Sequence, residues 1–151
     1  MAFDENQDFI QQLAQLNHEM TDYLNHHISC PNINANNYFY LLKLLNNPNI
    51  IQNDFSSLVK LNQSTITRSV NALEKNGYLI KHAAVDKRSH TLQLTESGTT
   101  AAKDISALID YLNNNILACD PKIDVATLIQ RMRQLNSPTP TSHNRLNDES
   151  A

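Results

Sequence analysis

The apolar residues of this chain follow a helical spacing over most of its length, and that spacing changes to a two-residue alternation in one place. The alternation predicts two strands, at about 78–82 and 90–95, joined by a polar, charged connection. Before Gly77 and after Glu96, apolar residues recur every three or four positions, which predicts amphipathic helices. The chain is therefore expected to be mainly α with one small β-hairpin.

Breaks in the helical spacing separate six predicted helices. Proline and asparagine-rich stretches end the first two, and Gly77 supplies a left-handed stop for the fourth. The polar tail over 137–151 is punctuated by proline and is expected to be disordered. The predicted helices cover residues 4–28, 36–46, 52–59, 63–76, 96–118 and 122–135.

Two short helices joined by a tight turn and followed by a hairpin with a charged tip are typical of a winged helix-turn-helix. We expect this unit over about 36–98, flanked by long N- and C-terminal dimerisation helices at about 4–28 and 96–136. The flanking helices carry more apolar positions than one small winged domain can cover. Their exposed stripes therefore predict a two-fold homodimer.

One face of the predicted helix 63–76 is suited to reading DNA. Ile66, Val70 and Leu73 fall within an arc of about 60° and are expected to pack inward. Arginine can bind guanine and asparagine can bind adenine on a base edge, while hydroxyl groups suit phosphate oxygens. The alternative is an ordinary solvated helix face. The outward side chains are Ser64, Thr67, Arg68, Asn71 and Lys75, with no acid among them.

Basic charge is concentrated around this helix, although the whole chain has a formal net charge of −3. Residues 60–90 contain six Lys or Arg and two Asp or Glu, a net charge of +4. The first 42 residues contain no Lys or Arg. A basic middle between acidic flanks is typical of a module that contacts double-stranded DNA.

The predicted hairpin tip, Val85–Ser89, carries two cations. Lys87 and Arg88 are suited to a narrow minor groove, whose negative potential attracts basic side chains. Asp86 is interpreted as a brace that pairs with Arg88 or another wing cation and holds the shape of the loop. The alternative is a loop tip that serves only solubility.

Five segments follow one another in an order and spacing that belong together: Pro48–Phe55, Leu61–Arg68, Leu73–Leu79, Asp86–Ser89 and Leu92–Gly98. With the long flanking helices, they resemble the MarR (multiple antibiotic resistance regulator) family of bacterial winged-helix repressors over about 4–136. The resemblance implies a single MarR-like domain in residues 1–136. It also implies a homodimer formed by the terminal helices, with a recognition helix that reads the major groove.

The resemblance implies specific roles for several side chains. The recognition positions are Ser64, Thr65, Thr67 and Arg68, and Arg88 is the wing residue, oriented by Asp86. The expected function is a bacterial DNA-binding transcriptional regulator, a repressor, that binds a pseudo-palindromic operator and is released by a small-molecule effector. The full set of predicted DNA-contacting residues is Lys60, Gln63, Ser64, Thr65, Thr67, Arg68, Asn71, Lys75, Lys87 and Arg88.

The sequence departs from the family pattern at three places. Ile51 stands where a threonine often caps the first short helix, which predicts a loose helix start. Lys60 stands in the inter-helix turn where glycine is common, so it either holds a strained backbone or uses its charge on phosphate. Ala83 and Ala84 give the first arm of the wing two small side chains without charged or hydrogen-bonding groups.

The resemblance also implies an effector pocket between the dimer helices and the DNA-binding lobe. The candidate lining residues are His18, Tyr23, His27 and Tyr38, and the effector class is small aromatic or lipophilic. The tyrosines are equally well explained as core residues. The sequence does not identify the effector.

Other chemistries are disfavoured. His26, His27 and Cys30 lie close in sequence, but surface or pocket-edge histidines are the better interpretation, and no metal or other cofactor is expected. Cys30 and Cys119 are interpreted as buried thiols without a redox role.

The chain is not expected to be an enzyme, because no nucleophile elbow or phosphate loop appears and only two glycines occur. No apolar run is long enough to span a membrane, and cysteine usage predicts the cytoplasm. The competing hypothesis is a winged helix that binds a protein, or acts as an antagonist, without contacting DNA.

Overall fold

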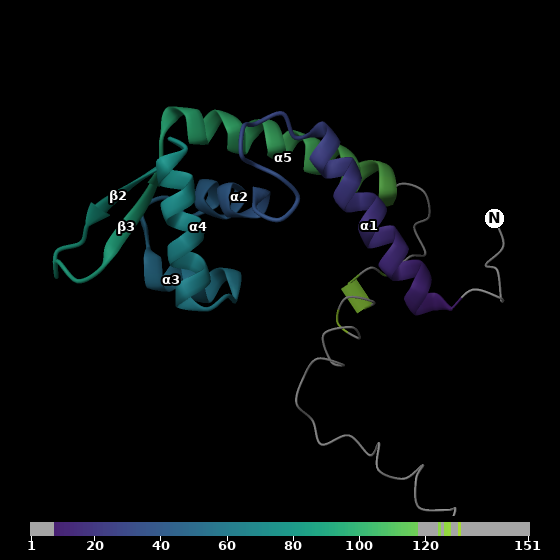
Figure 1. Ribbon diagram of the computed structural model, residues 1–151, viewed down its shortest axis with the longest axis horizontal. Coiled ribbons are helices and arrows are strands. Elements are labelled where there is room, and N and C mark those ends of the chain that lie inside the picture. Colours follow the sequence, from purple (N-terminus) through teal and green to yellow (C-terminus); the bar gives the residue numbers. More distant parts are fainter. Residues whose placement is uncertain (1–7, 118–123, 125, 128–129, 131–151) are drawn as a thin grey trace, which may run out of the picture. The chain divides into compact units, whose positions relative to one another are not determined.

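The computed structural model describes residues 8–117, 124, 126–127 and 130. It divides into two compact units, residues 1–110 and 111–151. Most of the predicted helix 122–135, Cys119 and the tail 137–151 lie outside the described residues, so the predicted domain limit at 136 stays a prediction. The elements, shown in Figure 1, are α1 (Phe9–His27), α2 (Tyr38–Asn46), β1 (Ile50–Ile51), α3 (Gln52–Val59), α4 (Gln63–Lys75), β2 (Leu79–Ala83), β3 (His90–Leu94) and α5 (Glu96–Leu117).

The fold class predicted from the sequence is confirmed: the described chain is mainly helical with a small antiparallel sheet. The sheet has three strands in the order β1-β3-β2, so the predicted hairpin gains a strand. Ile50 pairs with Leu92 and Ile51 with Thr91. Asn49, at φ 59°, turns the chain into this short strand. Ile51 therefore has a role as the last strand residue before α3, although its side chain makes no cap hydrogen bond.

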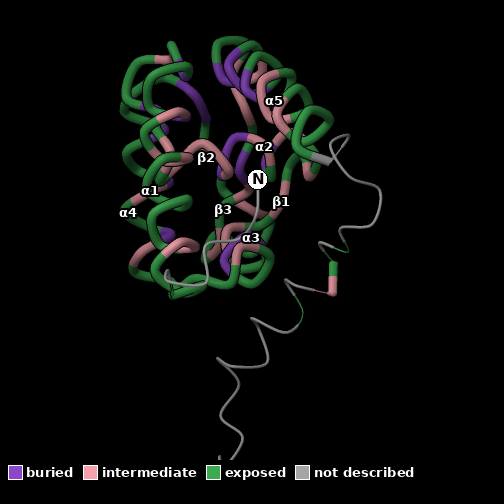
Figure 2. Tube along the Cα trace, turned by 90° about the vertical axis from the view of Figure 1, so that its right-hand side faces the viewer, coloured by how far each residue is buried: buried purple, intermediate pink, exposed green. Residues whose placement is uncertain are grey.

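The core lies between the sheet and the helices. Leu41, Phe55, Leu79 and Leu92 are fully buried, and they come from α2, α3, β2 and β3. Figure 2 marks buried residues in α2, α3 and α5. Burial of apolar surface of this kind stabilises the fold by about 1.5–3 kcal/mol for each large aliphatic or aromatic side chain.

Helix α4 is fixed on this core by the three residues that the helical spacing predicted to face inward. Ile66 and Val70 are 0% exposed and Leu73 is 3% exposed, which confirms their inward orientation. At the N-terminus of the helix, Asn62 Oδ1 accepts the Thr65 N–H over 2.8 Å. At its C-terminus, Gly77 adopts φ 80°, as the left-handed stop requires.

The turn between α3 and α4 contains a strained residue. Lys60 has φ 56° and ψ 40°, in the left-handed region. A non-glycine residue there costs about 1–2 kcal/mol. The buried Ser56 stabilises the turn, because its hydroxyl donates to the Leu61 carbonyl over 2.7 Å. The first of the two roles expected for Lys60, a strained backbone, is therefore observed.

The start of α5 lies directly against the chain before β2. The Thr95 hydroxyl donates to the Gly77 carbonyl over 2.6 Å and accepts the Gly98 N–H over 3.0 Å, as a helix N-cap does. A Cβ at Gly98 would lie 1.9 Å from the Tyr78 carbonyl oxygen. Only glycine allows this approach. Among the described residues, no helix is long and apolar enough to cross a membrane.

Candidate nucleic-acid interface

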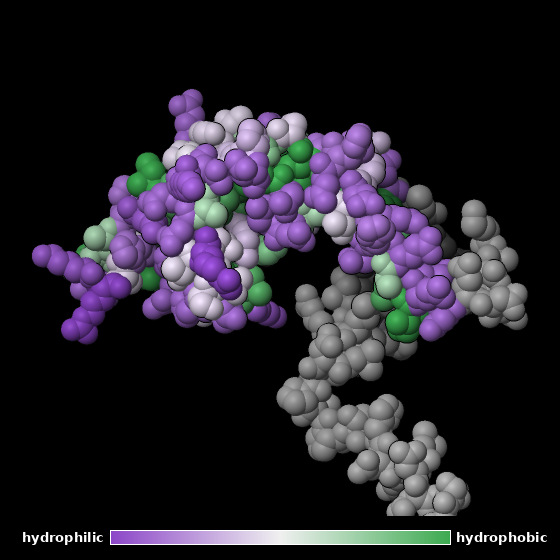
Figure 3. Space-filling view, viewed as in Figure 1, coloured by the Kyte–Doolittle hydropathy of each residue, from purple (hydrophilic) through white to green (hydrophobic). Residues whose placement is uncertain are grey.

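The outward face of α4 brings together most of the side chains predicted to contact DNA. Gln63, Ser64, Thr67 and Arg68 are exposed, as are Asn71 and Lys75 about one and two turns further along, and Thr65 is half-buried. Figure 3 shows strongly hydrophilic side chains on this part of the molecule and projecting from the loop between β2 and β3. The face is polar and basic, and it stands on an apolar core that keeps its position fixed.

Several of these side chains are already oriented by neighbours. The Ser64 hydroxyl donates to Asn62 Oδ1 over 2.9 Å. Gln52 of α3 donates to the Thr67 hydroxyl over 3.2 Å. Arg68 Nε lies 3.4 Å from the Ser64 carbonyl, a long contact that leaves the rest of its guanidinium for another partner.

One residue of this surface was missed by the sequence analysis. Lys81 of β2 reaches α4, where its Nζ lies 2.7 Å from Asn71 Oδ1 and 3.3 Å from Glu74 Oε2. The alternating pattern of β2 places Lys81 on one face of the strand but gives no information about which helix that face meets. Asn71, expected to read adenine, is therefore already partly engaged within the chain.

The wing loop is braced by Asp86 in a way that differs from the expected ion pair. Asp86 Oδ1 accepts the Ser89 hydroxyl over 2.8 Å and the N–H groups of Arg88 and Ser89 over 3.1 and 3.2 Å. These bonds, with the Ser89 hydroxyl making the largest contribution, lower the pKa of Asp86 below its usual range. Neither ion pair found among the described residues involves Asp86, so pairing with a cation was the wrong mechanism.

The backbone at the tip of the loop explains why Asp86 accepts N–H groups and does not pair with a cation. Lys87 adopts the left-handed conformation at φ 56°, and its N–H donates to the Ala84 carbonyl over 2.9 Å. This turn directs successive N–H groups toward the Asp86 carboxylate, which leaves the Lys87 and Arg88 side chains exposed. Two cations therefore extend from a loop whose backbone is held by a third residue.

A groove of about 360 Å³ runs beside α4. Arg68 and Thr65 line one side, and Asn32 and Asn37 of the α1–α2 connection line the other. Asn32 donates to Asn76 Oδ1 over 3.2 Å, which ties this connection to the end of α4. Helix α4 is thus supported from the side by a polar loop that the sequence analysis treated only as a helix break.

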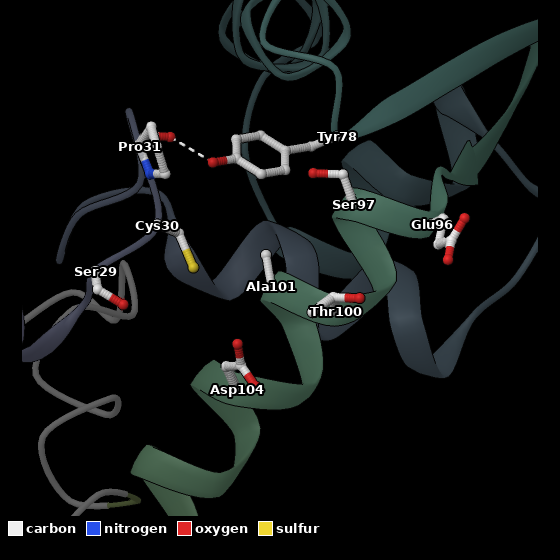
Figure 4. A pocket seen from close by; sticks show the side chains of 9 residues that line it. All are labelled: Ser29, Cys30, Pro31, Tyr78, Glu96, Ser97, Thr100, Ala101 and Asp104. Atoms are coloured by element: carbon white, nitrogen blue, oxygen red, sulfur yellow. Dashed lines mark hydrogen bonds between the residues drawn. The ribbon is translucent and has the colours of Figure 1, made fainter.

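A second hollow, of about 540 Å³, lies at the start of α5 (Figure 4). It is lined by Tyr78, whose hydroxyl donates to the carbonyl of another lining residue, Pro31, over 2.6 Å. The carboxylates of Glu96 and Asp104 line it, and no Lys or Arg does. The remaining lining residues are Ser29, Cys30, Ser97, Thr100 and Ala101.

The four residues expected to line an effector pocket lie elsewhere. His18 is exposed and lies 3.4 Å from the Asp22 carboxylate. The rings of Tyr23 and His27 stack with centroids 3.9 Å apart, and Tyr38 packs edge-on against Phe39. None of the four lines the 540 Å³ hollow, and His27 borders a small neighbouring one of about 40 Å³. Their assignment to an effector stays a prediction.

Cys30 is a half-buried free thiol at the edge of the larger hollow. Burial, with a smaller contribution from the Asp104 carboxylate, raises the pKa of this thiol. A raised pKa lowers the fraction of thiolate, the reactive form of the sulfur, at neutral pH. Within the part of the chain that the structure describes, no three His, Cys, Asp or Glu side chains are grouped as a metal ion would need.

Comparison with known proteins finds a family model that matches the central part of the chain. Residues 33–90 match the model of the MarR family. The chain is 31% identical over 80 residues to the HTH-type transcriptional regulator BilQ of Clostridioides difficile (strain CD3), a match that covers 52% of this chain and 54% of that relative. The chain thus spans about half the length of the curated relative that it matches.

Solved structures share the fold over most of the chain. The PcaV transcriptional regulator from Streptomyces coelicolor, solved with its natural ligand, superposes with a TM-score of 0.70 at 23% identity and covers 90% of this chain and 96% of its own. A MarR family regulator from Listeria monocytogenes, solved with a 26mer DNA, gives a TM-score of 0.67 at 22% identity. The match covers 86% of this chain and 87% of the Listeria chain. At these identities the likeness concerns the fold.

Proposed function

We propose that the protein is a MarR-type transcriptional regulator that binds double-stranded DNA as a homodimer, a proposal supported by the match of residues 33–90 to the MarR family model. The observation that carries the proposal is the outward face of α4. Its exposed residues include a guanidinium, an ammonium, an amide and hydroxyl groups, but only one carboxylate, Glu74, which is held by Lys81. Such a face complements the acceptor-rich edge of the major groove and the phosphates beside it.

The wing supports the same proposal. Lys87 and Arg88 extend from a braced loop, and cations in that position gain from the potential of a minor groove and from nearby phosphates. A winged helix that served only protein contacts would be expected to present apolar or acidic groups here. That alternative is the second candidate function, and no contact among the described residues favours it over DNA binding.

The homodimer is supported by apolar surface on α1. Phe9, Ile10 and Leu16 are 47, 61 and 56% exposed, and Leu24 is the buried residue of this helix. A helix that leaves such an apolar stripe in water gains stability when a second copy covers it. Two recognition helices related by a two-fold axis would read a pseudo-palindrome with half-sites about 10–10.5 base pairs apart.

The proposal also includes repression of transcription by the DNA-bound protein and its release from the operator by a small effector. A small aromatic or lipophilic molecule remains the expected effector class. The 540 Å³ hollow favours a neutral or cationic member of that class, because a carboxylate ligand would meet Glu96 and Asp104 without a lining cation. Calorimetric titration with matched aromatic amines and aromatic carboxylates tests this, and tighter binding of the carboxylates at this hollow would contradict it.

The test of the function is capture of genomic fragments by the purified protein, followed by sequencing and by sedimentation of the protein alone and with the recovered duplex. We expect enrichment of one pseudo-palindromic sequence, a dimer in the absence of DNA, and one dimer on each duplex. A stable monomer at micromolar concentration would contradict the dimer. Recovery of random fragments, or of none, would contradict sequence-specific binding.

Replacing Asp86 with alanine is expected to weaken operator binding, even though the change removes a negative charge from the DNA-facing loop. The loss of the three hydrogen bonds frees the loop, and ordering it again on DNA costs conformational entropy. Because its pKa is lowered, Asp86 stays ionised at neutral pH. The brace is lost only as acid protonates the carboxylate, when the pH falls through that lowered pKa.

The matched control is Asp86→Asn, which removes the charge and keeps an oxygen that can accept the same hydrogen bonds. We expect this variant to bind at least as tightly as the parent protein in titrations of labelled operator at several salt concentrations. If Asp86→Ala instead binds more tightly than both, Asp86 acts on DNA only through its charge and is not a brace.

A further inference from the structure

The side chain of Asn71 is held by a residue from the sheet. The Lys81 ammonium lies 2.7 Å from Asn71 Oδ1 and 3.3 Å from Glu74 Oε2. The backbone N–H of Lys81 also lies 3.4 Å from Glu74 Oε1. The Lys81 side chain is only 23% exposed, so the ammonium is fixed between β2 and α4 rather than free in solvent.

This contact decides which way the amide of Asn71 points. An ammonium group has three donors and no acceptor, so it can face only the oxygen of an amide. Asn71 Oδ1 is therefore turned toward Lys81, and the two N–H groups of Nδ2 are turned away from it. Because Asn71 is exposed on α4, these N–H groups are available to a partner outside the chain.

Asn71 then continues a row of hydrogen-bond donors along the helix. Arg68 lies three residues before it and Lys75 four residues after it, spacings that place all three on one side of α4. Guanidinium and ammonium groups donate and do not accept. With its oxygen engaged, Asn71 adds two further donors to this row and no free acceptor of comparable strength.

On the premise of the proposed DNA-binding function, we propose that Asn71, held by Lys81, acts as a donor-only contact. Its partner is a hydrogen-bond acceptor, either O6 or N7 of guanine on a base edge or a phosphate oxygen. It does not read adenine.

Adenine is disfavoured by the pairing that it needs. An asparagine reads adenine with both ends of its amide, accepting from the N6 amino group and donating to N7. In this structure the accepting oxygen already holds an ammonium, whose positive charge repels the hydrogens of a second amino group. Guanine presents two acceptors on the same edge and has no such conflict.

The experiment compares the wild-type protein with Asn71→Ala, Lys81→Met and the double variant. Binding sites are selected from a pool of randomised duplexes, and each protein is then titrated with the selected duplex and with its single-base variants. Lys75→Met is the matched control, since it removes an ammonium from the same row and leaves the oxygen of Asn71 untouched. Asn71→Ala is expected to fold, because alanine favours an exposed helix position.

If Asn71 contacts a base, Asn71→Ala relaxes a guanine preference at one position of each half-site by about tenfold. Lys81→Met then gains affinity for adenine at that position, and Lys75→Met does not. If Asn71 contacts a phosphate, Asn71→Ala weakens binding to all duplexes equally. In both cases the effect of Asn71→Ala is smaller in the Lys81→Met background, because the amide is no longer oriented.

Three results would overturn the inference while leaving the proposed function intact. In the first, wild-type protein selects adenine at the position that Asn71→Ala relaxes. In the second, Asn71→Ala changes neither affinity nor preference. In the third, Asn71→Ala has the same effect with and without Lys81. Failure of the wild-type protein to enrich any sequence is a different outcome, which contradicts the DNA-binding function itself. If Lys81→Met does not fold, the first two results still test the inference, because they need only the wild-type protein and Asn71→Ala.

Discussion

Arg68→Ala is expected to lower the affinity of the protein for its operator by about 2–6 kcal/mol, because each half of a two-fold complex loses a contact worth about 1–3 kcal/mol. Arg68 is exposed on the face of α4 opposite the buried Ile66 and Val70, and its guanidinium has one long internal contact. Specificity should relax at one base position in each half-site. Titration of labelled operator and of its single-base variants measures both effects.

The control for Arg68→Ala is Lys103→Ala, which removes an exposed cation from α5 that is not among the residues predicted to contact DNA. Loss of one charge at a distance is screened by salt, so this variant should bind nearly as well as the parent protein at physiological ionic strength. Equal losses from the two substitutions would show that net charge matters and that Arg68 does not read a base.

Gly98→Ala is expected to lower the free energy of unfolding by about 3 kcal/mol, the upper part of the range for forcing extra atoms into a packed site. The new Cβ would lie 1.9 Å from the Tyr78 carbonyl oxygen and 3.1 Å from a methyl group of Leu94. The backbone of Tyr78 cannot yield easily, because its ring is buried and its hydroxyl is bonded to the Pro31 carbonyl.

Gly77→Ala separates crowding from backbone strain. Gly77 has φ 80° and nothing within 4 Å of the position that a Cβ would take, so alanine there meets only the conformational cost of about 1 kcal/mol. Urea unfolding of the two variants and the parent measures the difference. If Gly98→Ala proves no less stable than Gly77→Ala, the start of α5 is less tightly packed against Tyr78 than the structure indicates.

Helices with strong periodicity could be predicted from the sequence almost to the residue. The predicted ranges 52–59 and 63–76 compare with Gln52–Val59 and Gln63–Lys75 in the structure, because turn residues bound both helices. Strand β1 could not be predicted in the same way. Two isoleucines give no alternation to detect, and their strand character comes from pairing with β3.

The candidate site, like the fold, could be predicted only in part from the sequence. The outward face of α4 could be predicted, since helical geometry alone determines which residues share a side. The contacts of Lys81 and Asp86 could not, because they depend on where β2 meets α4 and on the left-handed backbone of Lys87. Sequence spacing shows that charged groups are near one another, but the atoms that they contact are determined by the fold.

The pairing of β1 with β3 has a consequence for how the protein folds. Its partners are about 40 residues apart in the chain, and both short helices of the helix-turn-helix lie between them. Completing the sheet therefore requires closure of a long loop, which is slower than formation of a local hairpin. Strand β1 and helix α4 should accordingly gain hydrogen-exchange protection together during refolding, in a single late step. Helix α1 should form independently of that step.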